Sequence, residues 1–347
     1  MNELTKPTAI TSRLVSPHNL PQSDQDTWRQ FLAPRPIAFL SYAYTRAVAS
    51  CVPLVRVCCL ELSGRPVAYF PFQYRSRLHA AAGIGQCLGG ESGDYFGLIA
   101  EQGFHIAAED LLRLSGLKSL FFTQLTEDQR TCGLNGARRE AGHFIDFPEG
   151  GPAFWEGKRH SDKHFVADTE RRERALVRAH GPISFAYTDR DPAASLDRLI
   201  AEKRAQYRRT GVRDVLASGR MRATLHALCR TQDAQCSGVI STIRAGDTWV
   251  ASHFGLRAGP TLHYWFPVYN PELKNFAPGR ILLKQIILNA QSHGLTRIDR
   301  GAGDSPSKKD FSTSQHFFYG GLWQRPGIAA AAHRIGLAID WRIQSLR

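Results

Sequence analysis

The segment NFAPGRILLKQIILNAQSHGLTRIDRGAGD, residues 275–304, contains a Pro-Gly turn, a helical pattern, a short strand and a glycine-rich turn. Its apolar residues recur at helical spacing and predict a helix that packs on a sheet: Leu282, Leu283, Ile286, Ile287 and Ala290. Pro278 fixes the backbone before the helix, Gly279 permits close approach of a ligand, and Arg280 adds positive charge. The helix start is therefore a predicted anion site, with phosphate or pyrophosphate as its ligand; a plain structural turn is the alternative.

The order of predicted elements around this segment occurs twice. Residues 54–76 predict a hairpin that turns at Ser63-Gly64, and strands at 93–100 and 117–125 flank a helix at 104–116. Residues 236–257 predict a second hairpin, followed by a strand at 261–269, the helix at 279–293 and a strand at 295–299. Because the order repeats without sequence repetition, we expect two fused copies of one small α/β unit.

The remaining segments complete the predicted domain organisation. Residues 1–22 predict an extended lead-in, 23–150 the first half, 151–210 a basic helical linker, 211–325 the second half and 326–347 a packing helix.

Composition indicates a globular protein with an anionic partner. The chain has 347 residues, 43% of them hydrophobic, and a formal net charge of +13. It has no apolar run near the roughly 20 residues that cross a bilayer and no signal pattern, so we expect a cytoplasmic protein without a transmembrane segment. Its seven cysteines form no metal-ligand spacing, and we expect no metal cofactor. The charge favours nucleic acid, acidic lipid, anionic glycan or a phosphorylated cofactor without choosing among them.

The second half resembles the GNAT superfamily of acetyltransferases, in the branch labelled CelD-like, which is associated with cellulose and exopolysaccharide biosynthesis. The stretches SHFGLR (252–257), LHYWFPVYNPELKNFAPGRILLKQII (262–287) and GLTRIDRGAGDSPSKKDF (294–311) carry the resemblance. In the first half, PVAYFPFQ and GDYFGLI resemble the branch's N-terminal strands. The resemblance implies a mixed α/β (α+β) fold of two fused GNAT-like units, each a mostly antiparallel sheet flanked by helices.

The resemblance also implies acetyl-CoA or another acyl-CoA as the co-substrate. Its pyrophosphate would lie on the turn formed by Ala277, Pro278, Gly279, Arg280 and Ile281. The pantetheine arm would lie where the strand at 262–269 separates from the strand at 295–299. The branch often has serine in place of Ala277, which removes one hydroxyl contact but leaves the backbone amides. In the first half Glu101 stands near the corresponding helix start and would repel a pyrophosphate, so only the second half is expected to bind the cofactor.

Four residues are candidates for the chemistry of acyl transfer. His253 lies in the strand beside the cofactor strand and is a candidate base, or else a hydrogen-bonded structural histidine. Asp299 ends the strand after the helix, and Asp304 lies in the glycine-rich turn that follows; both could face the cleft. The alternative for Asp299 is that it caps a turn or pairs with Arg297 or Arg300. Lys308 matches the lysine of a family YK element, although Ser307 stands where tyrosine is usual.

Three further residues are candidates for acceptor binding. Asp94 and Tyr95 match a DY element of the family in the first half, with burial of Tyr95 in the core as the alternative. Tyr264 lies in the aromatic-rich strand of the second half.

The sequence thus predicts an acyltransferase that transfers groups other than aminoacyl groups, from acyl-CoA to an amine or hydroxyl of a sugar, a polysaccharide precursor or a lipid-linked intermediate. A complex of polysaccharide-synthesis proteins is a candidate partner, and a nucleic-acid partner is not expected. One alternative is a Fem-type transferase whose donor is an aminoacyl-tRNA, bound by the basic helices. Another is a non-catalytic module that binds a polyanion or a partner protein.

Overall fold

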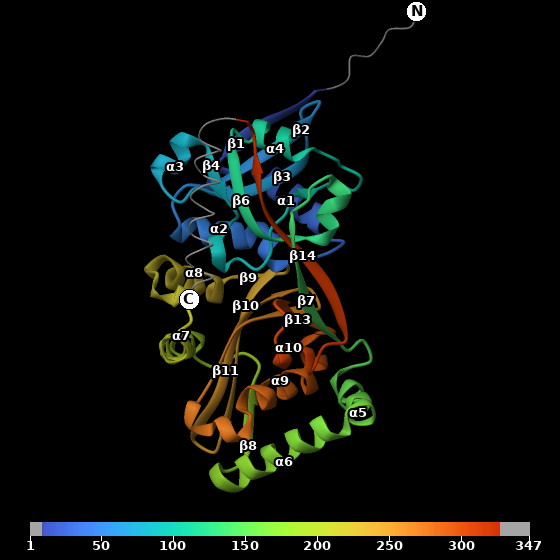
Figure 1. Cartoon of the computed structure of the whole chain (residues 1–347), viewed down its shortest axis with the longest axis vertical. Helices are drawn as coiled ribbons and strands as arrows, with labels where there is room; N and C mark the ends of the chain where they lie inside the picture. The colour runs from blue at the N-terminus through green and yellow to red at the C-terminus, as the bar shows by residue number, and fades with distance from the viewer. Residues whose placement is uncertain (1–8, 327–347) are drawn as a thin grey trace, which may run out of the picture. The chain divides into compact units, whose positions relative to one another are not determined.

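The computed structural model describes residues 9–326, which form two compact units. Unit 1 contains the described residues up to Ala141 and those from His316 onward, and unit 2 runs from Gly142 to Gln315 (Figure 1). The predicted boundaries after residues 22, 150, 210 and 325 remain predictions. The C-terminal helix predicted at 326–347 lies, apart from its first residue, outside the described residues, as do residues 1–8 of the lead-in.

Unit 1 contains a mixed sheet whose strands follow the order β1-β2-β3-β4-β6-β14. The strands are β1 (Ile10–Val15), β2 (Val55–Leu62), β3 (Arg65–Gln73), β4 (Ile84–Gln86), β6 (Ser119–Thr126) and β14 (Ser314–Gln324, in this unit from His316), with β5 (Ile99–Ala100) paired to β3. Its helices are α1 (Gln22–Leu32), α2 (Tyr42–Cys51), α3 (Arg77–Ala82) and α4 (Ala108–Leu114). The predicted hairpin is present, and its turn residues Ser63 and Gly64 both have positive φ, which matches the twist of the two strands.

Unit 2 contains strands of mixed orientation in the order β7-β13-β12-β11-β10-β8. Its strands are β7 (Arg138–Asp146, in this unit from Gly142), β13 (Arg297–Ala302), β12 (Thr261–Tyr269), β11 (Thr248–Ala258), β10 (Cys236–Ala245) and β8 (Ile183–Ala186), with β9 (Gln232–Asp233) paired to β10. Its helices are α5 (Gly151–Ser161), α6 (Lys163–His180), α7 (Pro192–Thr210), α8 (Gly219–Arg230), α9 (Pro278–Leu288) and α10 (Pro306–Lys309). The β12–β13 pair is parallel and the other pairs of this order are antiparallel.

The two units repeat one order of elements, as the sequence predicts. In each unit a strand and two helices precede a hairpin, further strand residues, a helix and a final strand. These elements are β1, α1, α2, β2, β3, β4, β5, α4 and β6 in unit 1, which also has α3 after β3. In unit 2 they are β8, α7, α8, β10, β11, β12, α9 and β13, with the short β9 before β10. The fold class of mixed sheets flanked by helices is therefore confirmed.

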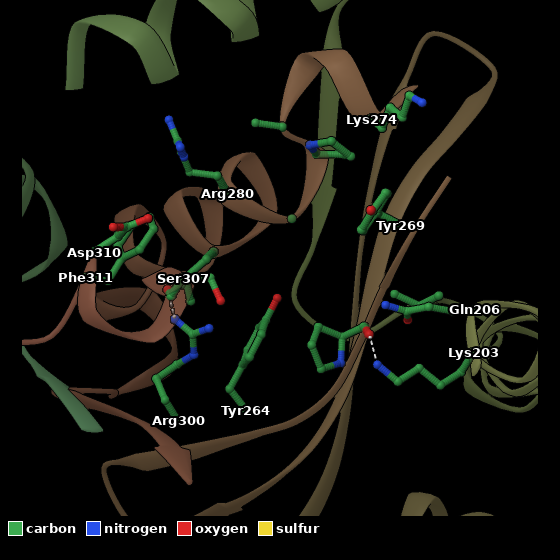
Figure 2. A pocket seen from close by; sticks show the side chains of 16 residues that line it. Lys203, Gln206, Tyr264, Tyr269, Lys274, Arg280, Arg300, Ser307, Asp310 and Phe311 are labelled. Carbon is green, nitrogen blue, oxygen red and sulfur yellow. Dashed lines mark hydrogen bonds between the residues drawn. The ribbon is translucent and has the colours of Figure 1, made fainter. Parts of the chain in front are cut away.

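The core of unit 2 fixes the position of α9. All five residues of the predicted apolar stripe are buried and pack with residues of β10, β11 and β12. The side of α9 away from the sheet is covered by α5 and α6, and α7 lies on the other side of β11 and β12 (Figures 1 and 2). Among the described helices none is both long and apolar enough to span a bilayer.

Helix α5 approaches α9 at a glycine. A Cβ atom built at Gly151 would lie 1.8 Å from the backbone oxygen of Ile287, so no larger residue fits without moving one helix. Gly157, on the same helix, is exposed, and a Cβ built there meets nothing within 4 Å.

We therefore predict opposite effects of one substitution at these two sites. Gly151→Ala should lower the free energy of unfolding by about 1–3 kcal/mol, because the methyl group overpacks the contact between α5 and α9. Gly157→Ala should raise it by up to about 1 kcal/mol, because alanine favours the helix. Urea denaturation of both variants measures the difference, and equal effects would contradict this account of the α5–α9 contact.

Candidate active site

The start of α9 presents an open backbone donor. Ala277 precedes the helix in the left-handed conformation, with φ 54° and ψ 53°. Its carbonyl accepts hydrogen bonds from the N–H groups of Arg280 (3.0 Å) and Ile281 (3.2 Å), and Pro278 has no N–H. The N–H of Gly279 makes no hydrogen bond within the described residues, and it stands at the positive end of the helix dipole. This arrangement can bind an anion.

The space in front of Gly279 is open. A Cβ atom built on this residue meets nothing within 4 Å, and its φ lies outside the range that disfavours side chains. Neither packing nor backbone geometry therefore requires glycine here. What glycine leaves free is the approach to the helix start.

Arg280 is held beside the helix start by α6. Its guanidinium lies 3.1 Å from the carboxylate of Asp168 and 4.5 Å from the ring centre of Phe165. Asp168 also binds Arg171 and Arg172, and the hydrogen bonds from Arg172 and Arg171 lower its pKa to about 2. Three arginines thus share one carboxylate, which leaves this side of the helix start positively charged.

The strands β12 and β13 separate after a short paired segment. Thr261, Leu262 and His263 pair with residues 297–299, and β12 then continues to Tyr269 without further pairing to β13. At the point of separation β12 bulges, because Tyr264 and Trp265 together oppose the single residue Gly255 of β11. The backbone edge of β12 beyond His263 is therefore open toward β13.

A cavity of about 350 Å³ joins this open edge to the start of α9 (Figure 2). It falls in the usual size range of small-molecule sites. The lining residues come from α7, β12, α9 and the segment after β13: Lys203, Gln206, Tyr264, Pro267, Val268, Tyr269, Lys274, Ala277, Pro278, Gly279, Arg280, Leu283, Arg300, Ser307, Asp310 and Phe311.

Tyr264 projects into this cavity from the bulge. Figure 2 shows its hydroxyl pointing into the pocket, and this hydroxyl makes no hydrogen bond to a described residue. Burial raises the pKa of Tyr264 to about 12, and the positive charge of Arg300 opposes the shift. The guanidinium of Arg300 lies 5.2 Å from the centre of the Tyr264 ring. The phenol is therefore protonated at neutral pH.

His253 lies behind Tyr264 and does not line the cavity. The two rings are stacked, with centroids 4.3 Å apart and planes 4° from parallel. Burial lowers the pKa of His253 to about 3, although the nearby backbone of His263 opposes the shift. A histidine with this pKa is neutral and weakly basic at pH 7, so its contact with Tyr264 is the feature that connects it to the site.

Asp299 is buried beside the paired part of β12. Its carboxylate accepts a hydrogen bond of 2.8 Å from the N–H of Gly301 and lies 3.0 Å from Nδ1 of His263. It forms no pair with Arg297, which binds Asp146 at 2.5 Å. Asp299 therefore lies at the point where β12 and β13 separate, next to the cavity lining rather than in it.

Asp304 and Lys308 lie in the turn after β13. The half-exposed carboxylate of Asp304 contacts Lys309 (2.7 Å) and His143 (3.0 Å), and the hydrogen bond from Lys309 is the main reason that its pKa is lowered. The ammonium of Lys308 binds the carbonyl oxygens of Gly301 and Ala302. Neither residue lines the cavity, although their neighbour Ser307 does.

Asp94 and Tyr95 belong to unit 1, whereas the cavity belongs to unit 2. Tyr95 is buried, and its hydroxyl lies 3.2 Å from Nε2 of His316. In the same unit, α4 has Glu109 and Asp110 in its first turn, which disfavours an anion there. Both substrate-binding assignments remain predictions.

All five residues predicted at the helix start are brought together, and four of them line the cavity with Tyr264; Ile281 is buried in the core behind them. The lining residues that the sequence did not single out include Lys203, Lys274 and Arg300. Lys203 lies on a basic helix whose charge pattern is typical of a solvent-exposed face, and Arg300 was considered only as a partner of Asp299. Among the described residues no cluster of three or more His, Cys, Asp and Glu side chains could hold a metal ion.

Comparisons with known proteins show what the second unit is similar to. Residues 163–309 match the family model described as the acetyltransferase (GNAT) domain. The matched segment covers α6 to α10 and holds most of the cavity lining. No curated protein matches the sequence.

Solved structures resemble a larger part of the chain. FemX shares 10% identity and a TM-score of 0.56, over 89% of this chain and 96% of its own. The C-terminal DUF2156 domain of a putative lysylphosphatidylglycerol synthetase from Agrobacterium fabrum shares 12% identity and a TM-score of 0.52, over 90% and 95%. A tandem GNAT protein from the clavulanic acid biosynthesis pathway shares 10% identity and a TM-score of 0.49, over 92% and 100%. These likenesses concern the fold.

The burial of His253 generates a prediction about pH. The unfolded histidine has an ordinary pKa of 6.5 and the folded one about 3, so the unfolded state binds more protons between these values. The free energy of unfolding should therefore fall as the pH drops from about 6.5 toward 3. His253→Gln removes this contribution, and its stability should depend less steeply on pH in that window.

Urea denaturation at pH 7.5, 6 and 5 measures the two slopes. His160→Gln is the matched control, because the His160 side chain is 78% exposed on α5. Parallel slopes for wild type and His253→Gln would contradict the buried neutral state.

Proposed function

We propose that the protein is an acyl-CoA-dependent N- or O-acyltransferase. One observation carries the proposal: in a GNAT acetyltransferase domain, a cavity connects the open N–H of Gly279 with the unpaired edge of β12 and the hydroxyl of Tyr264. A donor with an anionic group at one end and a thioester at the other fits these three features.

The residues at the start of α9 suit the phosphates of CoA. The Gly279 N–H and the helix dipole provide a backbone anion site, and Arg280 and Lys274 add positive charge at the cavity wall. The open backbone edge of β12 offers hydrogen bonds to the amides of a pantetheine arm, as a neighbouring strand would. Ala277 supplies no side-chain oxygen here, so the backbone is the main phosphate contact.

Tyr264 is the proposed general acid. Bound acyl-CoA supplies an activated thioester carbonyl. The acceptor forms a bond to the carbonyl carbon, the carbon–sulfur bond breaks, and the departing sulfur requires a proton. The Tyr264 phenol, which is protonated at neutral pH, donates that proton and recovers one from solvent. The proton lost by the acceptor passes to solvent.

The earlier catalytic candidates are proposed in supporting positions. His253 holds the ring of Tyr264 by stacking, and the buried pair of Asp299 and His263 ends the pairing of β12 with β13. Lys308 fixes the turn that carries Ser307 by binding two backbone carbonyls, while Asp304 is held by Lys309 and His143.

The acceptor is proposed to be a sugar, a surface-polysaccharide precursor or a lipid-linked intermediate. This proposal rests on the CelD-like sequence resemblance, as does a link to cellulose or exopolysaccharide biosynthesis. Asp94 and Tyr95 are kept as proposed acceptor contacts.

A Fem-type aminoacyl transfer is the second candidate, favoured by the likeness to FemX over nearly the whole chain. It requires basic helices that are free to follow RNA phosphates. Several basic residues on α5, α6 and α7 are instead paired with carboxylates: Arg159 with Glu170, Arg171 and Arg172 with Asp168, and Arg204 with Asp214. We therefore favour the CoA-dependent reaction.

The helix start gives the most direct test of this function. Calorimetric titration should show that the wild-type protein binds acetyl-CoA, and Gly279→Glu should weaken binding at least about 100-fold, because a carboxylate would fill the open anion site. Gly157→Glu is the control, since it introduces the same side chain at an exposed position outside the cavity, and should retain wild-type affinity.

The other outcomes separate the candidate functions. Absence of binding to acetyl-CoA and longer acyl-CoAs, or unchanged binding by Gly279→Glu, would reject the acyl-CoA proposal. Copurification of tRNA that is released by salt would favour the Fem-type reaction. A protein that binds neither donor would be a binding module.

The role of Tyr264 is tested by removing one oxygen atom. Tyr264→Phe should lower kcat by about 100-fold or more, in the range typical of a lost general acid, and leave the Kd for acetyl-CoA within about threefold. Tyr269→Phe, a change at another tyrosine of the lining, should retain kcat within about threefold. Equal losses in the two variants would contradict the assignment of the acid to Tyr264.

A further inference from the structure

Positive charge exceeds negative charge along the cavity. The charged lining residues are four cations, Lys203, Lys274, Arg280 and Arg300, and one carboxylate, Asp310. Arg280 is paired with Asp168. Removing a charge from water is costly unless a partner of opposite sign replaces the water, so the surplus predicts bound anions.

Lys203 lacks a carboxylate partner. Its ammonium donates a hydrogen bond of 2.9 Å to the backbone oxygen of Pro267, and in the described part of the chain it forms no ion pair. Burial alone lowers its pKa, to about 8, and no neighbouring charge contributes. At pH 7 the group is a half-buried cation with donor capacity left for a ligand.

Arg300, on the other side of the pocket, also lacks a carboxylate partner among the described residues. One of its nitrogens makes a long contact of 3.4 Å to the backbone oxygen of Ser307, and its guanidinium faces the ring of Tyr264. Asp310 and Asp299 influence its pKa, which burial lowers, but no carboxylate within residues 9–326 forms an ion pair with it. Its planar set of donors suits a carboxylate or a phosphate.

These two cations are distinct from those at the helix start. Arg280 directly follows Gly279, whose N–H is open, and Lys274 lies five residues before it. Lys203 comes from α7, and Arg300 follows Asp299 on β13 (Figure 2). Figure 2 places Lys203 and Arg300 on either side of Tyr264 and apart from Arg280. The phosphates of a donor held at the helix start therefore leave the second pair of cations unneutralised.

We propose that the acceptor of this enzyme carries an anionic group, a carboxylate or a phosphate, and that the positive charges of Lys203 and Arg300, on either side of Tyr264, attract it to this part of the cavity. The inference rests on the proposed acyl-CoA-dependent function and specifies the substrate class of the same site. An acidic acceptor supplies the missing charge, and its fixed anion would place the reacting amine or hydroxyl near the Tyr264 hydroxyl.

Binding to the full-length protein saturated with CoA at pH 7 tests the proposal. The probes are glucosamine, glucosamine 6-phosphate, 2-amino-2-deoxyglucuronic acid and inorganic phosphate. We expect each acidic sugar to bind at least about tenfold more tightly than glucosamine, the size of effect that one charge-assisted contact supports. Lys203→Gln and Arg300→Gln should each reduce that preference at least about fivefold, and Lys203→Glu should abolish it.

The controls separate this inference from the proposed function. Arg208→Gln makes the same change of charge on an exposed part of α7 outside the cavity and should retain the preference within about twofold. CoA titration precedes every measurement, because failure to bind CoA rejects the proposed function itself. Lys203 is only half-buried and its side chain is flexible, so we expect its variants to fold. These variants therefore keep the test valid if Arg300→Gln fails to fold.

Three results would overturn the inference while leaving CoA binding intact. The first is equal affinity for the acidic and neutral sugars, or no binding of any acidic probe. The second is an acid preference that survives in Lys203→Gln and Arg300→Gln. The third is an activity assay in which the protein acylates neutral glucosamine with succinyl-CoA but not with acetyl-CoA. Lys203 and Arg300 would then bind the carboxylate of the acyl group and not an anion of the acceptor.

Discussion

The second unit depends on where the pairing of β12 with β13 stops. Three residue pairs join the strands, and the bulge at Tyr264 and Trp265 then turns β12 away. A backbone edge left without a partner inside a protein is unfavourable unless water or a ligand satisfies its polar groups. The separation therefore creates both the cavity and the need for something to occupy it. The bulge also directs Tyr264 into the opening, so one irregularity sets the shape and the chemistry of the site.

The opposite wall of the cavity is α9, and the two helices between β7 and β8 hold α9 in place. Gly151 allows α5 to lie against the end of α9, and Glu173 of α6 binds the buried ammonium of Lys284 at 2.5 Å. A buried ion pair of this kind adds little net stability, but removing one partner destabilises the protein because the other charge is left buried alone. Its main effect here is to fix the rotation of α9. That rotation places Gly279 in the cavity lining.

The sequence predicted the parts of this site that local patterns encode. The apolar stripe of α9, the hairpins and the Pro-Gly start follow from spacing and from the properties of proline and glycine, and all are present. β1 and β8 were not predicted, because short strands at a sheet edge have few buried residues. α2 was missed as well, although Ser41 caps it by accepting a hydrogen bond from the N–H of Tyr44.

The side-chain arrangement was harder to predict because it depends on contacts distant in sequence. His253 looks like a cleft histidine in its strand, yet the bulge of β12 places Tyr264 over its ring. The turn cap that the sequence offers for Asp299 is present as its hydrogen bond from the N–H of Gly301, but its contact with His263 of the neighbouring strand was not predicted. Lys203 lies in a helix whose basic residues are typical of an exposed face, and only the crossing of α7 over β12 brings it to Pro267. Residue type predicts which groups can react, whereas strand pairing decides which of them meet.

The net charge of +13 acquires a meaning once pairing is taken into account. On α5, α6 and α7 several arginines are engaged by carboxylates of the same helices or nearby segments, which reduces the field that these helices offer to a polyanion. Some cations have no carboxylate partner, and among these the half-buried ones interact most strongly with a ligand. The reason is that water screens an exposed charge more effectively than a buried one. Lys203 and Arg300 are in that position within one cavity. Two cations without a carboxylate partner thus lie in one cavity of small-molecule size, which suits the compact acidic acceptor proposed above.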